Sequence, residues 1–410
     1  PLYHWWEGPF YGIGLKVYDV LAGKLGLEPS RHLSRRQTLR ALPNLHQEGL
    51  RGGALYYDGQ FDDARLAITL AQTAVAHGAT VLNYFKVTSF IKRKGKIVGV
   101  RATNQETGDA IHLYSKVVIN AAGIFSDEIR HLDKQKSPSL IVPSQGVHLV
   151  LPASFLKSKT AILVPHTDDG RIIFLVPWHG RVLVGTTDTA LKKPVLEPRA
   201  KEEEIKFLLK HAARYLTKEP THADILSHFA GIRPLVRQKT ARKTAALSRE
   251  HVIMTSSSGL VTIIGGKWTT YRKMAQDVID HIFPSRPCCT HDLKLFGYAQ
   301  GLNPQDPWSA YGSEIKQLKK LSHSHPRLKE KLIPSLPYTF AHGQWAIDHE
   351  MARTVEDVLS RRTRLLLLDA RAALKIAPQV AHFMAHHMKR SKKWERDQTK
   401  SFQLLTQRYH

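Results

Sequence analysis

Residues 263–283, IIGGKWTTYRKMAQDVIDHIF, place two adjacent glycines between an apolar run and a stretch of helical period. This order predicts a strand, a turn at Gly265 and Gly266, and a helix, because glycine permits sharp turns and close approach of another group. Apolar side chains recur on one face of the predicted helix: Trp268, Tyr271, Met274, Ala275, Val278, Ile279 and Ile282. Free N–H groups at a helix start attract anions, so the segment is either a structural corner or an anion-binding site.

A second strand–turn–helix unit lies earlier in the chain. The apolar run KVVIN (116–120) is followed by Ala121, Ala122 and Gly123, and a helix is expected from Ser126. Small residues after a buried strand leave the backbone open to a cofactor, although a tight turn needs the same residues. Further upstream, residues 64–79 have helical spacing, and strand patterns follow around residues 94–95.

The composition and the residue pattern of the sequence change beyond about residue 285. Short strand patterns dominate residues 142–188, whereas Pro, Ser and Lys crowd residues 284–340 and helical patterns dominate 341–390. We therefore expect a two-lobed region over 1–285, a boundary near 284–287, and a helical domain over 286–410. No apolar run approaches the roughly 18 residues that a membrane-spanning helix needs.

The chain is strongly basic, with 60 Lys and Arg against 35 Asp and Glu and a formal net charge of +25. This excess indicates an anionic partner, which is a phosphorylated substrate, an acidic membrane surface or nucleic acid, or else a solvated basic surface. No recognition-helix, zinc-finger or aromatic RNA-binding motif supports nucleic acid, so we expect no such partner. The two cysteines, Cys288 and Cys289, are adjacent, which disfavours a disulfide, forms no metal site and indicates a reducing compartment.

Two residues are candidates for substrate chemistry. Arg233, in AGIRPLVRQ, precedes a proline and so favours an extended backbone, from which a guanidinium can hold phosphate or carboxylate bidentately. His148, in PSQGVHLVL, lies in an alternating strand pattern, and a histidine can accept a hydroxyl proton near neutral pH. Each also has an ordinary explanation, a surface ion pair for Arg233 and one of 23 histidines for His148.

Together these segments resemble the FAD-dependent glycerol-3-phosphate dehydrogenases, membrane-associated flavoenzymes of the D-amino-acid-oxidase-like group. The resemblance covers nearly the whole chain and keeps its order. The matching segments are YYDGQFDDARL (56–66), VINAAGIFSDEI (118–129), QGVHLVLP (145–152), LVPWHGRVLVGTTDT (175–189), AGIRPLV (230–236), GGKWTTYRK (265–273) and TVEDVLSRRTRLLL (354–367).

The resemblance implies an α/β (α+β) fold of the two-lobed FAD-linked-reductase type. It has an incomplete Rossmann-like FAD domain (about 52–140 and 250–285), an antiparallel-sheet substrate domain (about 1–51 and 141–249) and a helical C-terminal domain. It implies oxidation of sn-glycerol 3-phosphate to dihydroxyacetone phosphate, with hydride transfer to FAD and electrons passed to a quinone. The implied location is cytoplasmic, peripheral on the inner face of the cytoplasmic membrane. A homo-oligomer is an open expectation, and the basic tail 386–400 is expected to help the protein dock on anionic lipid.

The family's site residues can be transferred position by position. His148, Arg233 and Lys267 are the implied catalytic residues, with His148 taking the proton of the C2 hydroxyl. The implied substrate ligands are Arg233, Arg249, Lys267 and Thr269. The residues implied at the cofactor are Val87, Ala122, Gly123, Gly265, Gly266, Lys267, Trp268 and Thr269. The resemblance implies no metal.

The family's opening segment has no counterpart here. That segment is a G-x-G-x-x-G turn that holds the FAD pyrophosphate, and GIGLKVYD at 12–19 lacks the third glycine. An arginine–tyrosine pair of the family's next segment is also absent from these 410 residues. Either the chain is a piece of a longer protein, or it is a remnant that acts as a non-catalytic subunit. An amine or amino-acid oxidase of the same fold, with Arg233 on a carboxylate, is the alternative enzyme.

Overall fold

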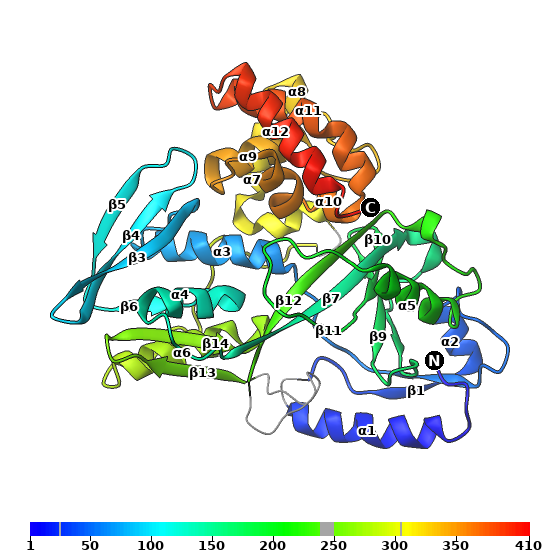
Figure 1. Ribbon diagram of the computed structural model, residues 1–410. Helices are drawn as coiled ribbons and strands as arrows, with labels where there is room; N and C mark the ends of the chain where they lie inside the picture. Colours follow the sequence, from blue (N-terminus) through cyan, green and yellow to red (C-terminus); the bar gives the residue numbers. More distant parts are fainter. Residues whose placement is uncertain (24–25, 238–249, 304–305) are drawn as a thin grey trace.

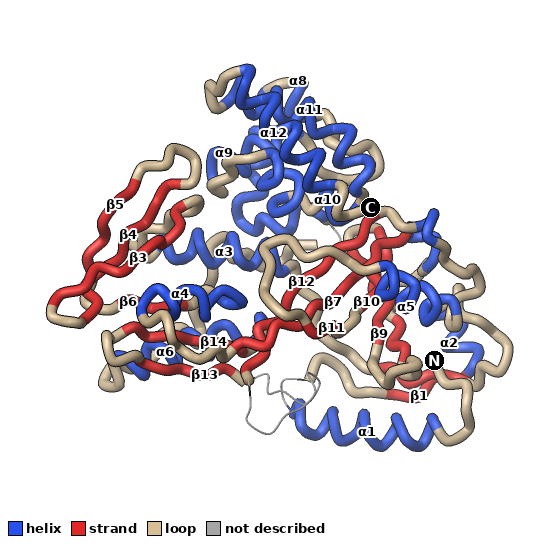
Figure 2. The backbone as a smooth tube through the Cα atoms, viewed as in Figure 1, coloured by secondary structure: helices blue, strands red, loops and turns tan. Residues whose placement is uncertain are grey.

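The computed structural model describes residues 1–23, 26–237, 250–303 and 306–410. In Figure 1 a helical region lies at the top, a β-meander lies at the left, and a large twisted sheet fills the centre. Figure 2 shows that the helices of the top region form one continuous group, whereas below it strands and helices alternate. The α/β class, with antiparallel sheets and a helical C-terminal region, is confirmed.

The central sheet has six strands, all paired antiparallel. Its long strand β7 pairs with β12 along one edge and with β10 and β11 along the other, and β9 and β8 follow β10. The strands are β7 (Ile141–Pro152), β8 (Ile162–Val164), β9 (Ile173–Trp178), β10 (Arg181–Gly185), β11 (Thr189–Ala190) and β12 (Ser227–Val236).

Successive side chains of these strands point to opposite faces of the sheet. On one face Val147, Leu149 and Leu151 are fully buried in an apolar core that helix α5 (Glu202–Ala213) covers. The short turns η3 (Ala153–Phe155) and η4 (His222–Asp224) close the ends of this lobe. The opposite face of β7 therefore presents the intervening residues, Gly146 and His148, towards the rest of the molecule.

A smaller sheet carries the two strand–turn–helix units. Strand β14 (Leu260–Gly265) pairs parallel with β6 (Val118–Asn120) and antiparallel with β13 (His251–Thr255). Beyond β6 come η2 (Gly123–Phe125) and α4 (Ser126–Asp133), and beyond β14 come η6 (Trp268–Thr270) and α6 (Tyr271–Ile282). Both predicted turns are therefore present. Only part of the predicted apolar face of α6 is covered, because Val278 is buried whereas Trp268 and Ile279 are exposed.

The predicted helix over 64–79 is α3 (Asp63–Ala76), which ends just before Gly78 at a φ of +86°. The meander that follows consists of β3 (Phe85–Arg93), β4 (Lys96–Asn104) and β5 (Ala110–Tyr114). At the N-terminus, α1 (Glu7–Ala22) packs on a two-stranded ribbon of β1 (Arg31–Ser34) and β2 (Gly52–Leu55). Between these strands α2 (Arg35–Ala41) starts at a capping box of Ser34 and Gln37.

The helical region has its own buried core, whose first member is Tyr311. Its elements are η7 (Pro307–Glu314), α7 (Ile315–Ser324), α8 (Pro326–Lys329), α9 (Phe340–His349), the π-helical η8 (Asp357–Arg362), α10 (Leu365–Leu368), α11 (Ala370–His387) and α12 (Lys392–Thr406). The boundary expected near residues 284–287 stays a prediction. Among the described residues, no helix is long and apolar enough to cross a membrane.

A buried ion pair joins the helical region to α3. Arg65 Nη1 donates to Glu350 Oε1 at 2.7 Å, both residues are buried, and the Arg65 guanidinium lies 4.8 Å from the centre of the Tyr311 ring. Nearby, Arg364 pairs with Asp62 at 2.6 Å. Because a buried charge is costly without its partner, these pairs fix how the helical region sits on the rest of the chain.

Replacing Arg65 by methionine should destabilise the protein by roughly 3–5 kcal/mol, because Glu350 is left as an unpaired buried charge. The double variant R65M/E350M should recover most of that loss. Urea unfolding monitored by circular dichroism measures both. The control is the exposed pair of Arg353 and Glu106, 2.8 Å apart, where R353M should cost about 1 kcal/mol or less. Equal losses for R65M and R353M would contradict this account.

Candidate functional site

On the face away from the core, the pairing of β7 with β12 places two glycines opposite each other, which leaves a surface without side chains. Gly146 lies opposite Gly231, and the flanking pairs are His148 with Phe229 and Ser144 with Arg233. Directly opposed residues of antiparallel strands project from the same face of the sheet. Two glycines without side chains are therefore bounded by an imidazole at one end and a guanidinium at the other. We call this surface the glycine floor.

The guanidinium of Arg233 is held in place by the segment after β10. Its Nη1 donates to the Thr187 carbonyl oxygen at 3.2 Å and its Nη2 to Thr186 Oγ1 at 3.3 Å, and Asp188 lies 3.7 Å away. A Cβ on Gly146 would lie only 2.6 Å from Arg233 Nη2 and 2.7 Å from Thr186 Oγ1. Glycine at 146 is therefore what allows the guanidinium to lie flat on the floor, where it can meet an anion.

His148 stands at the other end of the floor with its ring stacked on Phe229, at 5.3 Å between ring centres and 21° between planes. A side chain on Gly185 of the neighbouring strand would collide with this ring, so glycine leaves the room that it occupies. Burial, together with the positive charge of Arg233, lowers the pKa of His148 from 6.5 to about 4. The imidazole is therefore neutral at pH 7 and can accept a proton.

The turn after β14 packs against the far end of β12. Gly265 and Gly266 have φ values of +85° and +80°, and a Cβ on Gly265 would lie 2.7 Å from Val236 Cγ2. Val236 is the last residue of β12, three positions beyond Arg233. Lys267, Trp268 and Thr269 follow directly and are exposed. In this turn Thr270 Oγ1 accepts from the Lys267 N–H at 3.3 Å.

The turn after β6 lies beside it, because β6 and β14 are parallel and their carboxyl ends share one edge of the sheet. Asn120 fixes this turn: its Nδ2 donates to the Ser126 carbonyl at 2.9 Å, and its Oδ1 accepts from the Ala122 N–H at 3.2 Å. Gly123 has a φ of +57°, and a Cβ built there would meet nothing within 4 Å. The backbone at Ala122–Gly123 is therefore open to a neighbouring molecule, and η2 also contacts β12 and β14.

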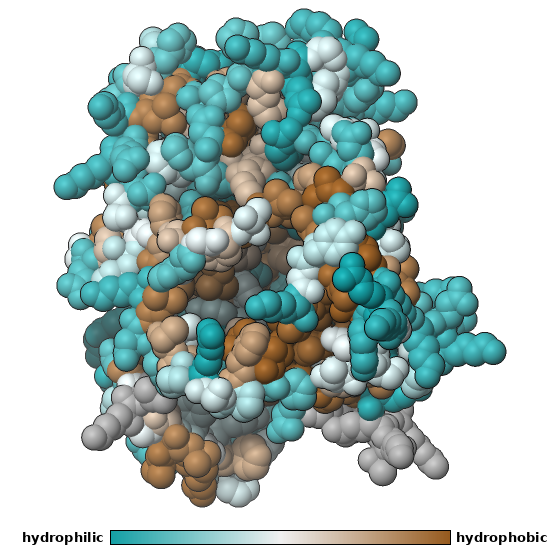
Figure 3. Space-filling model, turned by 90° about the vertical axis from the view of Figure 1, so that its left-hand side faces the viewer, coloured by the Kyte–Doolittle hydropathy of each residue, from teal (hydrophilic) through white to brown (hydrophobic). Residues whose placement is uncertain are grey.

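Most of the predicted site residues thus gather in one region. His148 and Arg233 share the glycine floor, and the two turns carry Ala122, Gly123, Gly265, Gly266, Lys267, Trp268 and Thr269. Val87 lies apart in the meander, half-buried beside a bulge in β3. Arg249 lies outside the described residues. The face that carries the meander and the β13–β14 hairpin is hollowed at its centre, with apolar side chains around the hollow (Figure 3).

The residues present fit a flavin at the two turns. Open backbone after two parallel strands and a helix start with two preceding glycines suit an electron-rich, anionic ring system. The G-x-G-x-x-G segment that would hold the pyrophosphate is not part of the 410 residues. Among the described residues, no group of His, Cys, Asp and Glu is arranged to hold a metal ion.

Several residues of the site were missed by the sequence reasoning: Gly146, Thr186, Thr187, Asp188, Phe229 and Gly231. The sequence does contain a signal for some of them. In GVH (146–148) and FAGIR (229–233) every second residue is Gly, His, Phe or Arg, and every second residue of a strand lies on the same face. The alignment of these two segments joins strands about 85 residues apart in the chain, from Gly146 to Gly231, and pairing over such a separation is a property of the fold.

Comparison with known proteins identifies the family of the chain. A model of FAD dependent oxidoreductases matches residues 13–272, and a model of the C-terminal domain of alpha-glycerophosphate oxidase matches residues 261–395. The mitochondrial glycerol-3-phosphate dehydrogenase of Schizosaccharomyces pombe is 36% identical over 452 residues, which cover 94% of this chain and 69% of that protein. The chain belongs to the FAD-dependent glycerol-3-phosphate dehydrogenase family.

The family is FAD-dependent, and a solved structure of one member has the same fold. The glycerol-3-phosphate dehydrogenase from Bacillus halodurans complexed with FAD is 30% identical, with a TM-score of 0.80 over 92% of this chain and 79% of that one. The human mitochondrial glycerol-3-phosphate dehydrogenase is 36% identical across the whole chain, which spans 60% of its length. For the relatives that we compared, the chain spans 58% to 69% of their length.

Replacing Gly146 by alanine should weaken the binding of inorganic phosphate about tenfold or more, because the added methyl displaces the Arg233 guanidinium and a hydrogen bond to a charged group contributes roughly 1.5–3 kcal/mol. Isothermal titration calorimetry measures the affinity. Gly14→Ala is the control, since a Cβ there meets nothing within 4 Å. Unchanged phosphate affinity in G146A would show that Arg233 does not bind the anion from this position.

The lowered pKa of His148 makes stability depend on pH. The unfolded chain binds a proton at this residue near pH 6.5, whereas the folded chain does so only near pH 4, so acidification across this window favours unfolding. Replacing His148 by glutamine should therefore reduce the loss of stability between pH 6.5 and pH 4. Urea midpoints at several pH values give the comparison. If wild type and H148Q lose the same stability, His148 is not held neutral by the fold.

Proposed function

We propose that this chain is the greater part of an enzyme that oxidises sn-glycerol 3-phosphate to dihydroxyacetone phosphate. The observation that carries the proposal is the glycine floor, which has a guanidinium at one end and a neutral imidazole at the other. A substrate that carries a phosphate and a nearby secondary alcohol could use both groups. The names of the relatives, glycerol-3-phosphate dehydrogenase, support the same substrate.

The phosphate is assigned to the cationic end of the floor. Arg233 binds it through the guanidinium, whose orientation Thr186 and Thr187 fix, and Lys267 approaches from the turn after β14. Arg249 is proposed as a third cation on the phosphate. Thr269 is proposed to contact both substrate and cofactor. Because a Cβ on Gly231 would meet nothing within 4 Å, the three-carbon backbone of the substrate is proposed to lie over Gly231.

The proton of the C2 hydroxyl is assigned to His148. Its pKa of about 4 keeps the imidazole neutral at physiological pH, and Phe229 fixes the ring plane by stacking. FAD, when bound, supplies the acceptor for the hydride that leaves C2. The residues proposed to hold it are Val87, Ala122, Gly123, Gly265, Gly266, Lys267, Trp268 and Thr269. Excluding water from the floor is the role proposed for the aromatic side chains of Phe229 and Trp178, whose ring centres are 6.1 Å apart.

We propose further that the electrons pass to a quinone and that the protein attaches peripherally to an anionic membrane. The net charge of +25 supports attachment to an acidic surface. The relatives are named mitochondrial, so the proposal here is a membrane surface in general rather than the inner face of a cytoplasmic membrane. A homo-oligomer remains part of the proposal.

The decisive assay compares substrates and variants in the natural gene product supplied with FAD and a soluble electron acceptor. Arg233→Met should raise KM for glycerol 3-phosphate about 100-fold, because two charge-assisted hydrogen bonds to the phosphate are lost. His148→Asn should lower kcat by roughly 100-fold or more with little change in KM. Arg371→Met, at an exposed arginine of α11, is the control.

Three outcomes would contradict the proposal. Turnover of D-amino acids or sarcosine in place of glycerol 3-phosphate would indicate an amine or amino-acid oxidase, with Arg233 on a carboxylate. A protein that stays colourless after FAD is added would indicate a non-catalytic binding subunit. Full activity in both R233M and H148N would show that the glycine floor takes no part in the reaction.

A further inference from the structure

The segment between β10 and β11 contains one residue more than the part of β7 that it faces. The pairing of β7 with β10 ends at Gly185, and its pairing with β11 begins at Thr189. The three residues 186–188 therefore lie opposite only two residues of β7, 146–147. Such an extra residue, a β-bulge, interrupts the ladder of backbone hydrogen bonds and can re-aim the groups beside it. We call residues 186–188 the bulge.

Thr187, in the middle of the bulge, uses its side chain and its backbone on two different partners. Its Oγ1 accepts from the Val147 N–H at 3.0 Å, in the place of the backbone carbonyl that a regular ladder supplies. Its own carbonyl oxygen accepts from Arg233 Nη1 at 3.2 Å. Because one residue makes both contacts, whatever fixes the hydroxyl of Thr187 also fixes the carbonyl that meets the guanidinium.

The hydroxyl of Thr187 is held by Glu204 of α5. Glu204 Oε1 accepts from the Thr187 hydroxyl at 2.8 Å and from the Thr189 hydroxyl at 2.7 Å. Its Oε2 accepts from Gln145 Nε2 at 2.7 Å and from the Lys201 N–H at 3.0 Å. Glu204 is 6% exposed, and two donors on each oxygen satisfy the buried carboxylate.

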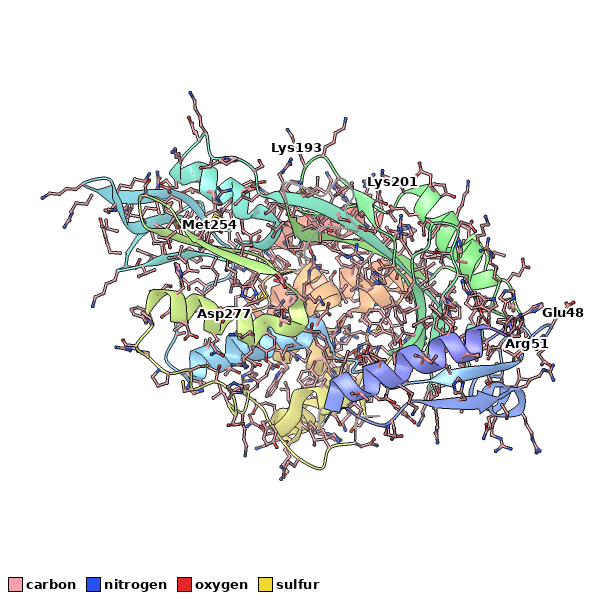
Figure 4. The ribbon with its side chains drawn as sticks, turned by 90° about the horizontal axis from the view of Figure 1, so that it is seen from below. Glu48, Arg51, Lys193, Lys201, Met254 and Asp277 are labelled. Atoms are coloured by element: carbon pink, nitrogen blue, oxygen red, sulfur yellow. The ribbon has the colours of Figure 1, made fainter. Side chains whose placement is uncertain are left out.

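Glu204 reaches the bulge from the core side of the sheet. Its helix, α5, contacts β7 and β10, and Figure 4, seen from below, labels Lys201 near the start of this helix beside the curved central sheet. Gln145 directly precedes Gly146 on β7, so its side chain lies on the face opposite to the glycine floor. Glu204 therefore lies behind the floor, and the bulge connects it to the opposite face.

We propose that Glu204 is a positioning residue for phosphate binding. It holds the hydroxyl of Thr187 so that the carbonyl of the same residue aims the Arg233 guanidinium at the substrate phosphate. Because a bulge interrupts the ladder, its conformation depends on side-chain hydrogen bonds such as these. A hydrogen bond to a carboxylate is about twice as strong as one between neutral groups, which suits it to this task. The role rests on the proposed function, in which Arg233 binds the phosphate.

The alternative is that Glu204 only caps α5, through the N–H of Lys201, and stabilises the lobe. The two roles differ in what they predict for the folded protein. A stabilising residue changes the free energy of unfolding and leaves the phosphate affinity of the folded state as it was, whereas a positioning residue changes that affinity. Phosphate affinity therefore separates the two roles.

The first test compares E204Q with E203Q, which makes the same change at the exposed neighbouring residue. Each of the four groups around Glu204 donates to it, so the amide NH2 of E204Q sets a donor against donors. Inorganic phosphate, titrated by isothermal calorimetry, should bind E204Q about tenfold more weakly, because a displaced guanidinium loses part of its contact with the anion. E203Q should bind phosphate like wild type.

The second test changes Thr187. T187V removes the hydroxyl and should weaken phosphate binding about as much as E204Q, whereas T187S restores the hydroxyl and should regain most of the affinity. In the double variant E204Q/T187V the losses should not add, because both changes break one contact. In the natural gene product with FAD and a soluble acceptor, E204Q and T187V should raise KM for glycerol 3-phosphate with little change in kcat. Circular dichroism melting checks that every variant is folded.

Two results would overturn the assignment. Wild-type phosphate affinity in E204Q, or in T187V where E204Q does not fold, would leave Glu204 with a role in stability alone. Additive losses in the double variant would mean that Glu204 acts by another route than Thr187. Unchanged phosphate binding in R233M would contradict the proposed function instead, so failure of the positioning role is distinguishable from failure of the proposed reaction.

Discussion

The continuous antiparallel pairing of β7 with β12 is the constraint on which the rest of the structure depends. It runs from Ile141 opposite Val236 to Val150 opposite Ser227, and one face of it supplies core while the other supplies the glycine floor. Because side chains alternate along a strand, a slip of one residue would bury His148 in the core and expose leucines in its place. Burial of apolar side chains on one face thus fixes the register of β7 and β12, and this register in turn positions the polar residues on the other face.

The same strand pair connects the site to two other parts of the chain. At the Val236 end of β12, the turn after β14 packs closely against Val236. Strand β12 therefore helps to position both the turn proposed to hold the cofactor and the floor proposed to hold the substrate. At the other end Phe229 and Trp178 pack against the core of the helical region. The ion pairs of Arg65 and Arg364 hold that region in place. The three parts meet around the floor, which is why residues far apart in sequence contribute to it.

Local chemistry made part of this structure predictable. The two strand–turn–helix units, the helix before Gly78 and the helical C-terminal region follow from residue spacing and glycine placement, and the structure contains them. The hydrogen bonds from Arg233 to the segment Thr186–Asp188 were not predicted, because they depend on which strands pair across the sheet. The exposed side of α6 was also missed, since a periodic apolar pattern does not say how much of it is covered. The role of each site residue stays a prediction.

The neighbouring rings of Trp178, Phe229 and His148 limit where the chain can be shortened without disturbing the glycine floor. Phe229, which stacks on the imidazole, and Trp178 both pack against the helical core, whose members begin at Tyr311. A protein shortened before Tyr311 would retain both His148 and Arg233 but would lose the core against which Phe229 and Trp178 pack. The helical region therefore supports the aromatic end of the glycine floor as well as burying its own core.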